Sequence, residues 1–282
     1  MSRTRNAVTW LAFLAVLTFT VIQLPGIAGR WYYESGIRFM RAQDYRHAAG
    51  ALRRSTFLRP GYARGYVDLG DALLRLKRYE EAEASFRAAL KLEEESCGHC
   101  GLGAVYFESG RYEEAEAAFR RAIELNPNDE CAYEWSGRMY YLRERYEKAA
   151  EAFEHAVRLQ PRAVVPMQFL GNSYTYLGRY EEAVETYRRI NALQPDYEEA
   201  HLELGVAYAY LKRYRDAADS YRRALELKSD DGRAVYGLAL AHSALGERRS
   251  AVAYYERLKS LDPAWAAELL KRIDYDGPEK GR

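Results

Sequence analysis

Residues 102–127, LGAVYFESGRYEEAEAAFRRAIELNP, are the stretch that decides the fold. Apolar and small residues recur three and four positions apart in both halves of this stretch, which is the period of an amphipathic helix. A short turn separates the halves, and Pro127 ends the second one because proline cannot continue a helix. The stretch therefore predicts two helices joined by a short turn.

The same pattern recurs along most of the chain. A small residue marks each period, and an alanine follows it twelve positions later. The small residues are Gly36, Gly70, Gly103, Gly137, Gly171, Gly205 and Ala239, and the alanines are Ala48, Ala82, Ala115, Ala149, Ala183, Ala217 and Ala251. Each step spans 34 residues except one step of 33, between Ala82 and Gly103. Such a period predicts a stack of small helical units rather than one globular core.

The markers have a packing reason. Two antiparallel helices approach closely only where neither carries a bulky side chain, so the small residue at unit position 8 and the alanine at position 20 are expected to meet. A large residue at position 24 is expected to fill the space beside them. These large residues are Leu52, Phe86, Phe119, Phe153, Tyr187, Tyr221 and Tyr255.

The period also predicts the domain organisation. The seven units are expected to cover residues 29–62, 63–95, 96–129, 130–163, 164–197, 198–231 and 232–265. A capping helix at 264–274 is expected to close the stack, with Trp265, Leu269 and Leu270 packed inward. Residues 275–282 are expected to be a disordered tail.

These residues resemble the tetratricopeptide repeat family. Its pattern has Leu-Gly at positions 7 and 8, Tyr at 11, Ala at 20, Phe at 24, Ala at 27 and Pro at 32. The third unit matches it from position 7 onward with Leu102, Gly103, Tyr106, Ala115, Phe119, Ala122 and Pro127. The resemblance covers residues 29 to about 265 and implies an all-α, right-handed superhelical solenoid. The first and seventh units depart from the pattern, as terminal units often do.

The resemblance also implies a binding surface. In this family the first helices of the units line a concave groove that binds proteins or peptides. Carried onto this chain, the groove positions hold Phe107, Glu108, Glu134, Arg138, Tyr141, Gln168, Asn172, Tyr176, Leu202 and Tyr210. Phe107, Tyr141, Tyr176 and Tyr210 would form an aromatic line. The alternative is that some of these residues pack on the next unit.

Composition and motifs restrict the class of partner. The chain has 42 basic and 41 acidic residues, and a nucleic-acid site would need a basic excess on one face. The lysine and asparagine pattern that binds chaperone C-termini in this family is absent from the equivalent positions of consecutive units. No phosphate loop, nucleophile elbow or metal-binding histidine pair occurs, so we expect neither catalysis nor a cofactor nor a small-molecule substrate.

The cysteines suggest a second function class. Residues 97–100, CGHC, spell a motif of disulfide isomerases, and Cys131 falls one unit after Cys97. A disulfide between Cys97 and Cys100 is one reading, a metal site with Cys131 is another, and three structural thiols are the third. The motif normally joins a strand to a helix, whereas its context here is helical. The alternative function is therefore a thiol-disulfide or metal-binding protein.

Residues 7–24 are almost wholly apolar and follow Arg3 and Arg5. Eighteen helical residues span about 27 Å, close to the thickness of a bilayer core. Residues 1–28 are therefore expected to be an N-terminal transmembrane helix, with the repeats on the periplasmic or extracellular side. The alternative is a signal peptide cleaved after Ala28, which would release a secreted protein. The combined expectation is a non-catalytic scaffold or assembly factor held at a membrane, with a partner peptide or helix in its groove.

Overall fold

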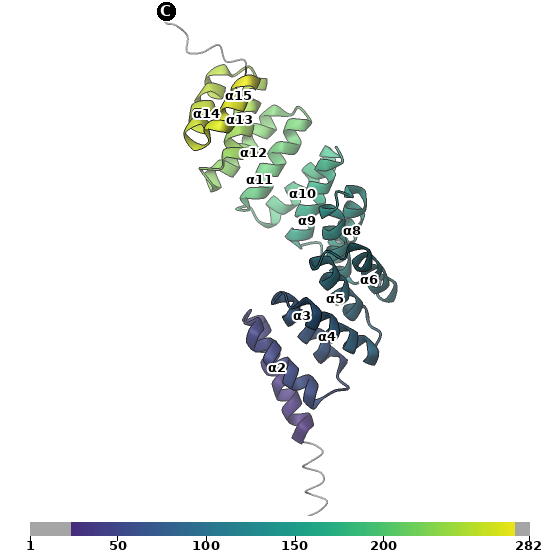
Figure 1. The fold of residues 1–282 in the computed structure, drawn as a ribbon. Coiled ribbons are helices and arrows are strands. Elements are labelled where there is room, and N and C mark those ends of the chain that lie inside the picture. Colours follow the sequence, from purple (N-terminus) through teal and green to yellow (C-terminus); the bar gives the residue numbers. More distant parts are fainter. Residues whose placement is uncertain (1–23, 274–282) are drawn as a thin grey trace, which may run out of the picture. The chain divides into compact units, whose positions relative to one another are not determined.

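The chain is helical throughout the residues that the structure describes. The structure is a computed structural model and describes residues 24–273, in which no strand occurs. Residues 24–41 of this range form the first helix. The helices that follow are α2 (Tyr45–Leu58), α3 (Ala63–Arg75), α4 (Tyr79–Leu92), α5 (Ser96–Glu108), α6 (Tyr112–Leu125), α7 (Glu130–Leu142), α8 (Tyr146–Leu159), α9 (Val164–Tyr176), α10 (Tyr180–Leu193), α11 (Glu198–Tyr210), α12 (Tyr214–Leu227), α13 (Gly232–Ala244), α14 (Arg248–Leu261) and α15 (Pro263–Arg272) (Figure 1).

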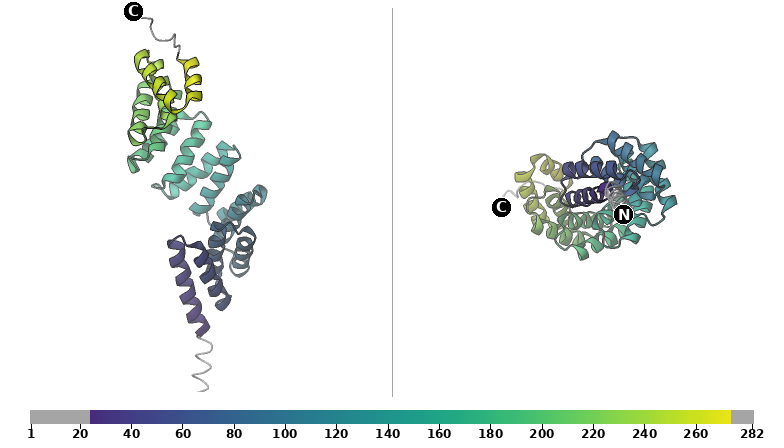
Figure 2. Two further views of the ribbon diagram at one scale, coloured as in Figure 1. Left: turned by 60° about the vertical axis from the view of Figure 1, so that its left-hand side comes forward. Right: turned by 90° about the horizontal axis from the view of Figure 1, so that it is seen from below.

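The chain consists of two compact units, and the division falls between Trp135 and Ser136 within α7. Within α2–α6 of the first unit and α8–α15 of the second, each helix packs on the next one along the chain (Figure 2). First helices of neighbouring repeats also touch: α3 contacts α5, and α11 contacts both α9 and α13. Within each unit a repeat thus packs on its neighbours, as a helical solenoid requires, so the predicted all-α repeat fold is confirmed.

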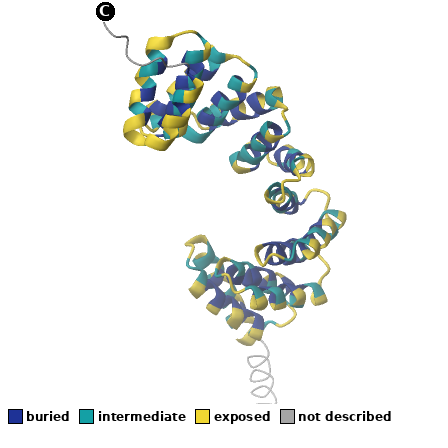
Figure 3. Cartoon of the chain, turned by 45° about the horizontal axis from the view of Figure 1, so that its top comes forward, coloured by how far each residue is buried: buried dark blue, intermediate teal, exposed yellow. Residues whose placement is uncertain are grey.

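Glycines at the small marker positions make room for large side chains. A Cβ atom built at Gly171 would lie 2.7 Å from the ring of Tyr187, and one at Gly103 would lie 2.4 Å from Phe119. Both rings are buried, like most residues on the helix sides that face other helices (Figure 3). The nearest atoms belong to the large residue at position 24 rather than to the alanine at position 20. The glycine therefore lets this side chain reach the backbone of the first helix.

One residue in each turn inside a repeat adopts the left-handed conformation. These residues occupy unit position 15 and are Gln43, Lys77, Gly110, Glu144, Gly178, Lys212 and Gly246. At Gly178 the φ angle is 73°, and the next amide, of Arg179, donates to Tyr174 O at 2.8 Å. This hydrogen bond satisfies a carbonyl at the end of the first helix. Sequence reasoning missed the position because four of its seven residues are not glycine.

Helix α15 lies where the capping helix is expected, and it packs on α13 and α14. Asp262 caps it by accepting hydrogen bonds from the amides of Ala264 and Trp265 at 2.9 and 3.0 Å. Leu269 is fully buried and Leu270 is half-buried, but Trp265 remains 43 % exposed. The indole therefore covers the end of the stack only in part, in contrast to the inward packing that the sequence suggested.

The predicted membrane localisation is not upheld. The predicted apolar span, residues 7–24, lies outside the described residues except for Leu24. Among residues 24–273, no helix has both the length and the apolar character needed to cross a bilayer. The expectation of a single-pass membrane protein with its repeats on the periplasmic or extracellular side is therefore corrected.

Candidate functional site

The second unit carries a hollow of about 470 Å³ that is lined mainly by tyrosines. Its lining comes from the end of α7, from α9, from the start of α10 and from α11. We call it the tyrosine groove, and it consists of Tyr141, Asn172, Thr175, Tyr176, Tyr180, Glu203, Val206 and Tyr210. Helices α9 and α11 are the first helices of successive repeats, so the hollow lies on the face where the sequence predicts the binding surface.

Ring stacking fixes the tyrosines of this groove. Tyr146 and Tyr176 stack with centroids 4.5 Å apart, and Tyr180 and Tyr210 stack at 4.6 Å. Tyr141 meets Tyr176 edge to face at 5.9 Å. Each stacked pair joins the second helix of one repeat to the first helix of the next. Tyr176 and Tyr210 nevertheless remain 63 % and 60 % exposed, so the structure holds their rings in place while leaving them accessible.

Two tyrosine hydroxyls orient the amides of the groove face. Tyr187 on α10 donates to Asn172 Oδ1 at 2.6 Å, and Tyr197 donates to Gln168 Oε1 at 2.6 Å. Burial raises the pKa of Tyr187, so its hydroxyl keeps its proton and remains a donor at neutral pH. The carbonyl oxygens of both amides are therefore engaged by the protein itself, which fixes each amide plane.

Glu203 supplies the only carboxylate in the lining of the tyrosine groove. Its side chain is half-buried on α11. Burial, reinforced by the neighbouring charge of Glu199, raises the pKa of Glu203 to about 7, and Arg233 opposes this shift. Sequence reasoning missed Glu203 because it occupies unit position 6, which lies outside the expected groove positions. The available signal was an acidic residue within the otherwise apolar run Leu202-Glu203-Leu204.

Two predicted groove residues are buried instead. Leu202 is 2 % exposed, and Phe107 in the first unit is 7 % exposed. The ring of Phe107 packs against Tyr112 and against Trp135, with centroids 6.1 and 5.9 Å apart. Phe107 thus follows the alternative of packing on the next repeat. The aromatic line that remains accessible consists of Tyr141, Tyr176 and Tyr210, all in the second unit.

The other predicted groove residues are at least partly exposed. In the first unit, Glu108 is exposed and Glu134 is half-buried. In the second unit, Arg138 is half-buried and its guanidinium lies 5.9 Å from the centroid of the Phe169 ring. Gln168 is half-buried on α9, four residues before Asn172, but it does not line the tyrosine groove.

The three cysteines lie around one hollow of about 320 Å³ in the first unit, together with Asp71. All three thiols are free. The hydrogen-bonded pair is Cys100 and Cys131, whereas Cys97 donates to Glu95 Oε2 at 3.5 Å. Among residues 24–273, no three histidine, cysteine or acidic side chains are grouped so that they could hold a metal ion. The metal-binding alternative therefore lacks support.

The electrostatics of this hollow do not favour thiol chemistry at the CGHC motif. Burial raises the pKa of Cys97 to about 11, with a further contribution from Glu95. The hydrogen bond with Cys131 and burial raise the pKa of Cys100, while the same bond lowers the pKa of Cys131. A nucleophilic thiol needs a lowered pKa, which neither cysteine of the motif has. Burial and Asp68 also raise the pKa of Asp71, to about 7.

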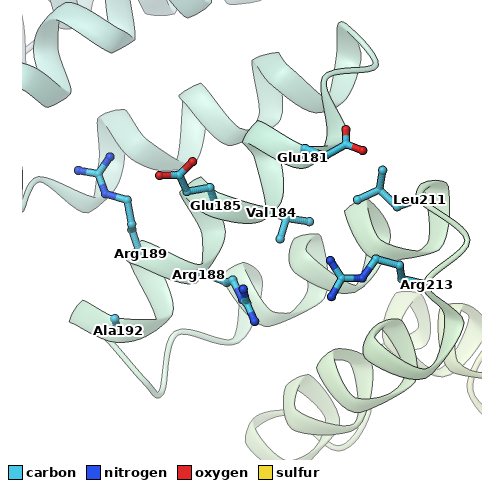
Figure 4. Close-up of a pocket in the computed structure, with 8 residues that line it drawn as sticks. All are labelled: Glu181, Val184, Glu185, Arg188, Arg189, Ala192, Leu211 and Arg213. Atoms are coloured by element: carbon cyan, nitrogen blue, oxygen red, sulfur yellow. The ribbon is translucent and has the colours of Figure 1, made fainter.

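A further hollow in the second unit, of about 430 Å³, lies on the second-helix face (Figure 4). Charged side chains of both signs line it, among them Glu185 and Arg189 of α10 and Arg213 before α12. The guanidinium of Arg213 pairs with Asp216 at 2.7 Å. Such exposed local pairs are weak, which fits the solvated outer face of a repeat rather than a binding site.

Comparison with known proteins places the repeats in one family. Models described as tetratricopeptide repeat or TPR repeat match residues 33–95, 96–129, 132–162, 171–212, 198–231 and 232–264. No curated protein matches the sequence.

Solved structures share the fold at low sequence identity. The C-terminal part of a TPR repeat-containing protein from Cytophaga hutchinsonii has a TM-score of 0.67 and 16 % identity, over 84 % of this chain and 99 % of that chain. PilF of Pseudomonas aeruginosa has a TM-score of 0.60 and 20 % identity, over 74 % and 96 %. YrrB, described as a TPR protein with an unusual peptide-binding site, has a TM-score of 0.58 and 22 % identity, over 67 % and 98 %.

The matched models together span well over half of the chain, and the matches at 96–129, 198–231 and 232–264 coincide with helix pairs of the structure. The chain therefore belongs to the tetratricopeptide repeat family.

Proposed function

We propose that this protein is a non-catalytic interaction scaffold or assembly factor that binds a partner peptide or helix in the tyrosine groove. The observation that carries the proposal is that the rings of Tyr176 and Tyr210 are both held in place and exposed. Each ring is stacked on a neighbour, yet 63 % and 60 % of the two residues stay exposed. A single exposed ring is common on protein surfaces, but several that line one hollow, as Tyr141, Tyr176 and Tyr210 do, are typical of an interface.

The physical chemistry of tyrosine suits this role. A tyrosine ring offers a large contact area and a polar tip, and few rotatable bonds are frozen when it binds. Stacking has already fixed the rings of Tyr176 and Tyr210, so a partner would not have to order them. Such preorganisation strengthens binding without any additional contact.

The groove continues along the second unit. A hollow of about 600 Å³ adjoins it, and both hollows are lined by Val206 and Tyr210. Tyr236, Leu240 and Trp265 line this adjoining hollow, and Trp265 is 43 % exposed. A surface that runs over several repeats suits an extended peptide or an amphipathic helix better than a compact molecule. YrrB, with its peptide-binding site, illustrates that the fold can serve this purpose.

A displayed library of random dodecapeptides tests the proposal. The library is selected against the wild-type protein and against a Tyr176→Ala/Tyr210→Ala variant. We expect the wild type to enrich peptides that the double variant binds at least tenfold more weakly. Phe57→Ala is the control, because Phe57 is 83 % exposed on α2 of the first unit and should be dispensable. Enriched peptides that bind the double variant as well as the wild type would refute the groove assignment.

A further inference from the structure

The carboxylate of Glu203 has no counter-charge in contact with it. Among residues 24–273, no ion pair or hydrogen bond engages this side chain. Its neighbour Glu199, one turn earlier on α11, differs in this respect because both of its oxygens accept from Arg233 at 2.9 Å. The guanidinium of Arg233 is thereby committed to Glu199, and it also pairs with Asp231 at 2.9 Å. Glu203 is left facing the tyrosine groove with its charge unmatched.

The lining of the tyrosine groove itself contains no lysine or arginine that could supply the missing charge. The adjoining hollow holds two arginines, Arg233, which is paired with Glu199, and Arg272. The remaining surface of the tyrosine groove consists of four tyrosine rings, the side chains of Val206 and Thr175, and the amide of Asn172. A half-buried carboxylate is costly without a partner, and a positive charge held close to it would offset that cost. Aromatic faces attract cations as well, through the negative potential above each ring.

We propose that the tyrosine groove binds a lysine or arginine side chain of the partner peptide, with Glu203 as its counter-ion. This inference rests on the proposed peptide-binding function. The charged head lies against Glu203, and the apolar stem lies along the rings of Tyr176 and Tyr210. Long basic side chains have this division between an apolar stem and a charged head. An acidic partner segment is disfavoured because the carboxylate of Glu203 would repel it.

The test separates this inference from the function on which it rests. From the peptides whose binding depends on Tyr176 and Tyr210, the tightest that carries an arginine is synthesised together with a copy in which citrulline replaces that arginine. Citrulline keeps the shape of arginine and removes its charge. Both peptides are titrated against the wild type, Glu203→Gln and Glu185→Gln. Glu185 is the matched control because it is an exposed glutamate on the outer helix α10.

We expect the wild type to bind the arginine peptide about tenfold more tightly than the citrulline peptide. The ratio should fall to about one in Glu203→Gln and stay unchanged in Glu185→Gln. Groove-dependent peptides without a common basic residue, or a ratio that survives Glu203→Gln, would overturn the inference and leave the peptide-binding function intact. If no peptide depends on Tyr176 and Tyr210, the proposed function itself fails, and this inference fails with it.

Discussion

Tyr210 stacks on Tyr180 with ring centroids 4.6 Å apart and ring planes 2° apart. Tyr180 is the first residue of α10 and Tyr210 is the last residue of α11, so the stack joins two successive repeats. Tyr146 and Tyr176 form the same contact one repeat earlier, with planes 7° apart. One side of each stack thus stabilises the junction between repeats, while the other presents a ring to the groove.

The stack at Tyr210 should contribute little to stability and much to binding. Tyr210→Ala removes a ring that is 60 % exposed, so we expect a loss of about 1 kcal/mol in the free energy of unfolding. Tyr187→Ala removes a fully buried ring and should cost about 3–5 kcal/mol. Urea titrations measure both losses. Tyr210→Phe keeps the stack and should restore stability, and equal losses for Tyr210→Ala and Tyr187→Ala would contradict the assignment.

The glycines at the small marker positions should tolerate no side chain. Gly171→Ala places a Cβ atom 2.7 Å from Tyr187, whose ring is fully buried and whose hydroxyl is bonded to Asn172. We expect a destabilisation of about 1–3 kcal/mol because the ring has no free space into which it can move. Gly50→Ala is the control, since a Cβ atom there would meet nothing within 4 Å. That variant should gain about 0.5–1 kcal/mol, because alanine favours a helix interior.

The left-handed position of each turn gives a separate prediction. Gly178→Ala forces a side chain into a conformation with φ of 73° and should cost about 1–2 kcal/mol. Lys212→Gly makes the opposite change at the equivalent position and should cause no loss. Thermal unfolding measures the stability of each variant relative to the wild type. A loss in Lys212→Gly equal to that in Gly178→Ala would show that the turns do not share this conformation.

Much of the fold could be predicted from the sequence, because the markers report contacts inside a repeat. Gly103 meets Phe119 and Gly171 meets Tyr187, each pair sixteen residues apart. Because the same spacing recurs in every repeat, one repeat supports the helix assignment of the next. The site was less predictable, because exposure depends on variable residues of the next repeat. Phe107 is buried since Trp135 and Tyr112 happen to pack against its ring. Tyr141 makes the equivalent contacts with Tyr146 and Phe169 one repeat later but stays half-buried, so the repeat pattern alone does not predict which ring is exposed.

The cysteines illustrate the same limit. The motif drew attention to Cys97 and Cys100, but the neighbouring repeat places Cys131 beside Cys100. We expect iodoacetamide at pH 7.5 to modify Cys131 first, because it is exposed and its pKa is lowered. Cys97, with a pKa of about 11, should react slowly, since almost all of it is protonated. Mass spectrometry of peptides sampled over time measures the order in which the cysteines are modified. Faster modification of Cys97 than of Cys131 would support the thiol-disulfide function.

The affinity for a cationic peptide should depend on pH. Glu203 has a pKa of about 7, so its carboxylate is largely present at pH 8 and largely protonated at pH 6. A cation requires the carboxylate, so affinity should fall as the pH falls from 8 to 6. Calorimetric titration at both values measures the change, and in Glu203→Gln the affinity should not change between them.

The groups that face Glu203 should not reproduce this dependence. Tyr187 and Tyr221 approach it from α10 and α12, and burial raises the pKa of each phenol, so both stay neutral. Arg233 on α13 stays charged, because its pairs with Glu199 and Asp231 raise its pKa. A pH dependence that persists in the Glu203→Gln variant would therefore contradict the assignment of the effect to Glu203.

The same pKa links Glu203 to stability. The pKa of Glu203 is raised from 4.5 to about 7 in the folded protein. Between these two pH values the folded protein therefore holds a proton that the unfolded chain releases. The contribution of Glu203 to stability is therefore present at low pH and is lost as the pH rises through about 7. Glu203→Gln should be more stable than the wild type at pH 8 but not at pH 4. Denaturation at the two values checks the sign, and a stabilisation that appears only at pH 4 would contradict it.

The central claim is that the tyrosine groove binds a partner peptide. Its most direct test is an NMR titration of protein with isotope-labelled tyrosine rings, using a peptide from the library selection. We predict that the resonances of Tyr141, Tyr176, Tyr180 and Tyr210 shift together, with one dissociation constant, while tyrosines of the first unit such as Tyr45 stay unchanged. Shifts confined to other tyrosines, with those four unaffected, would contradict the claim.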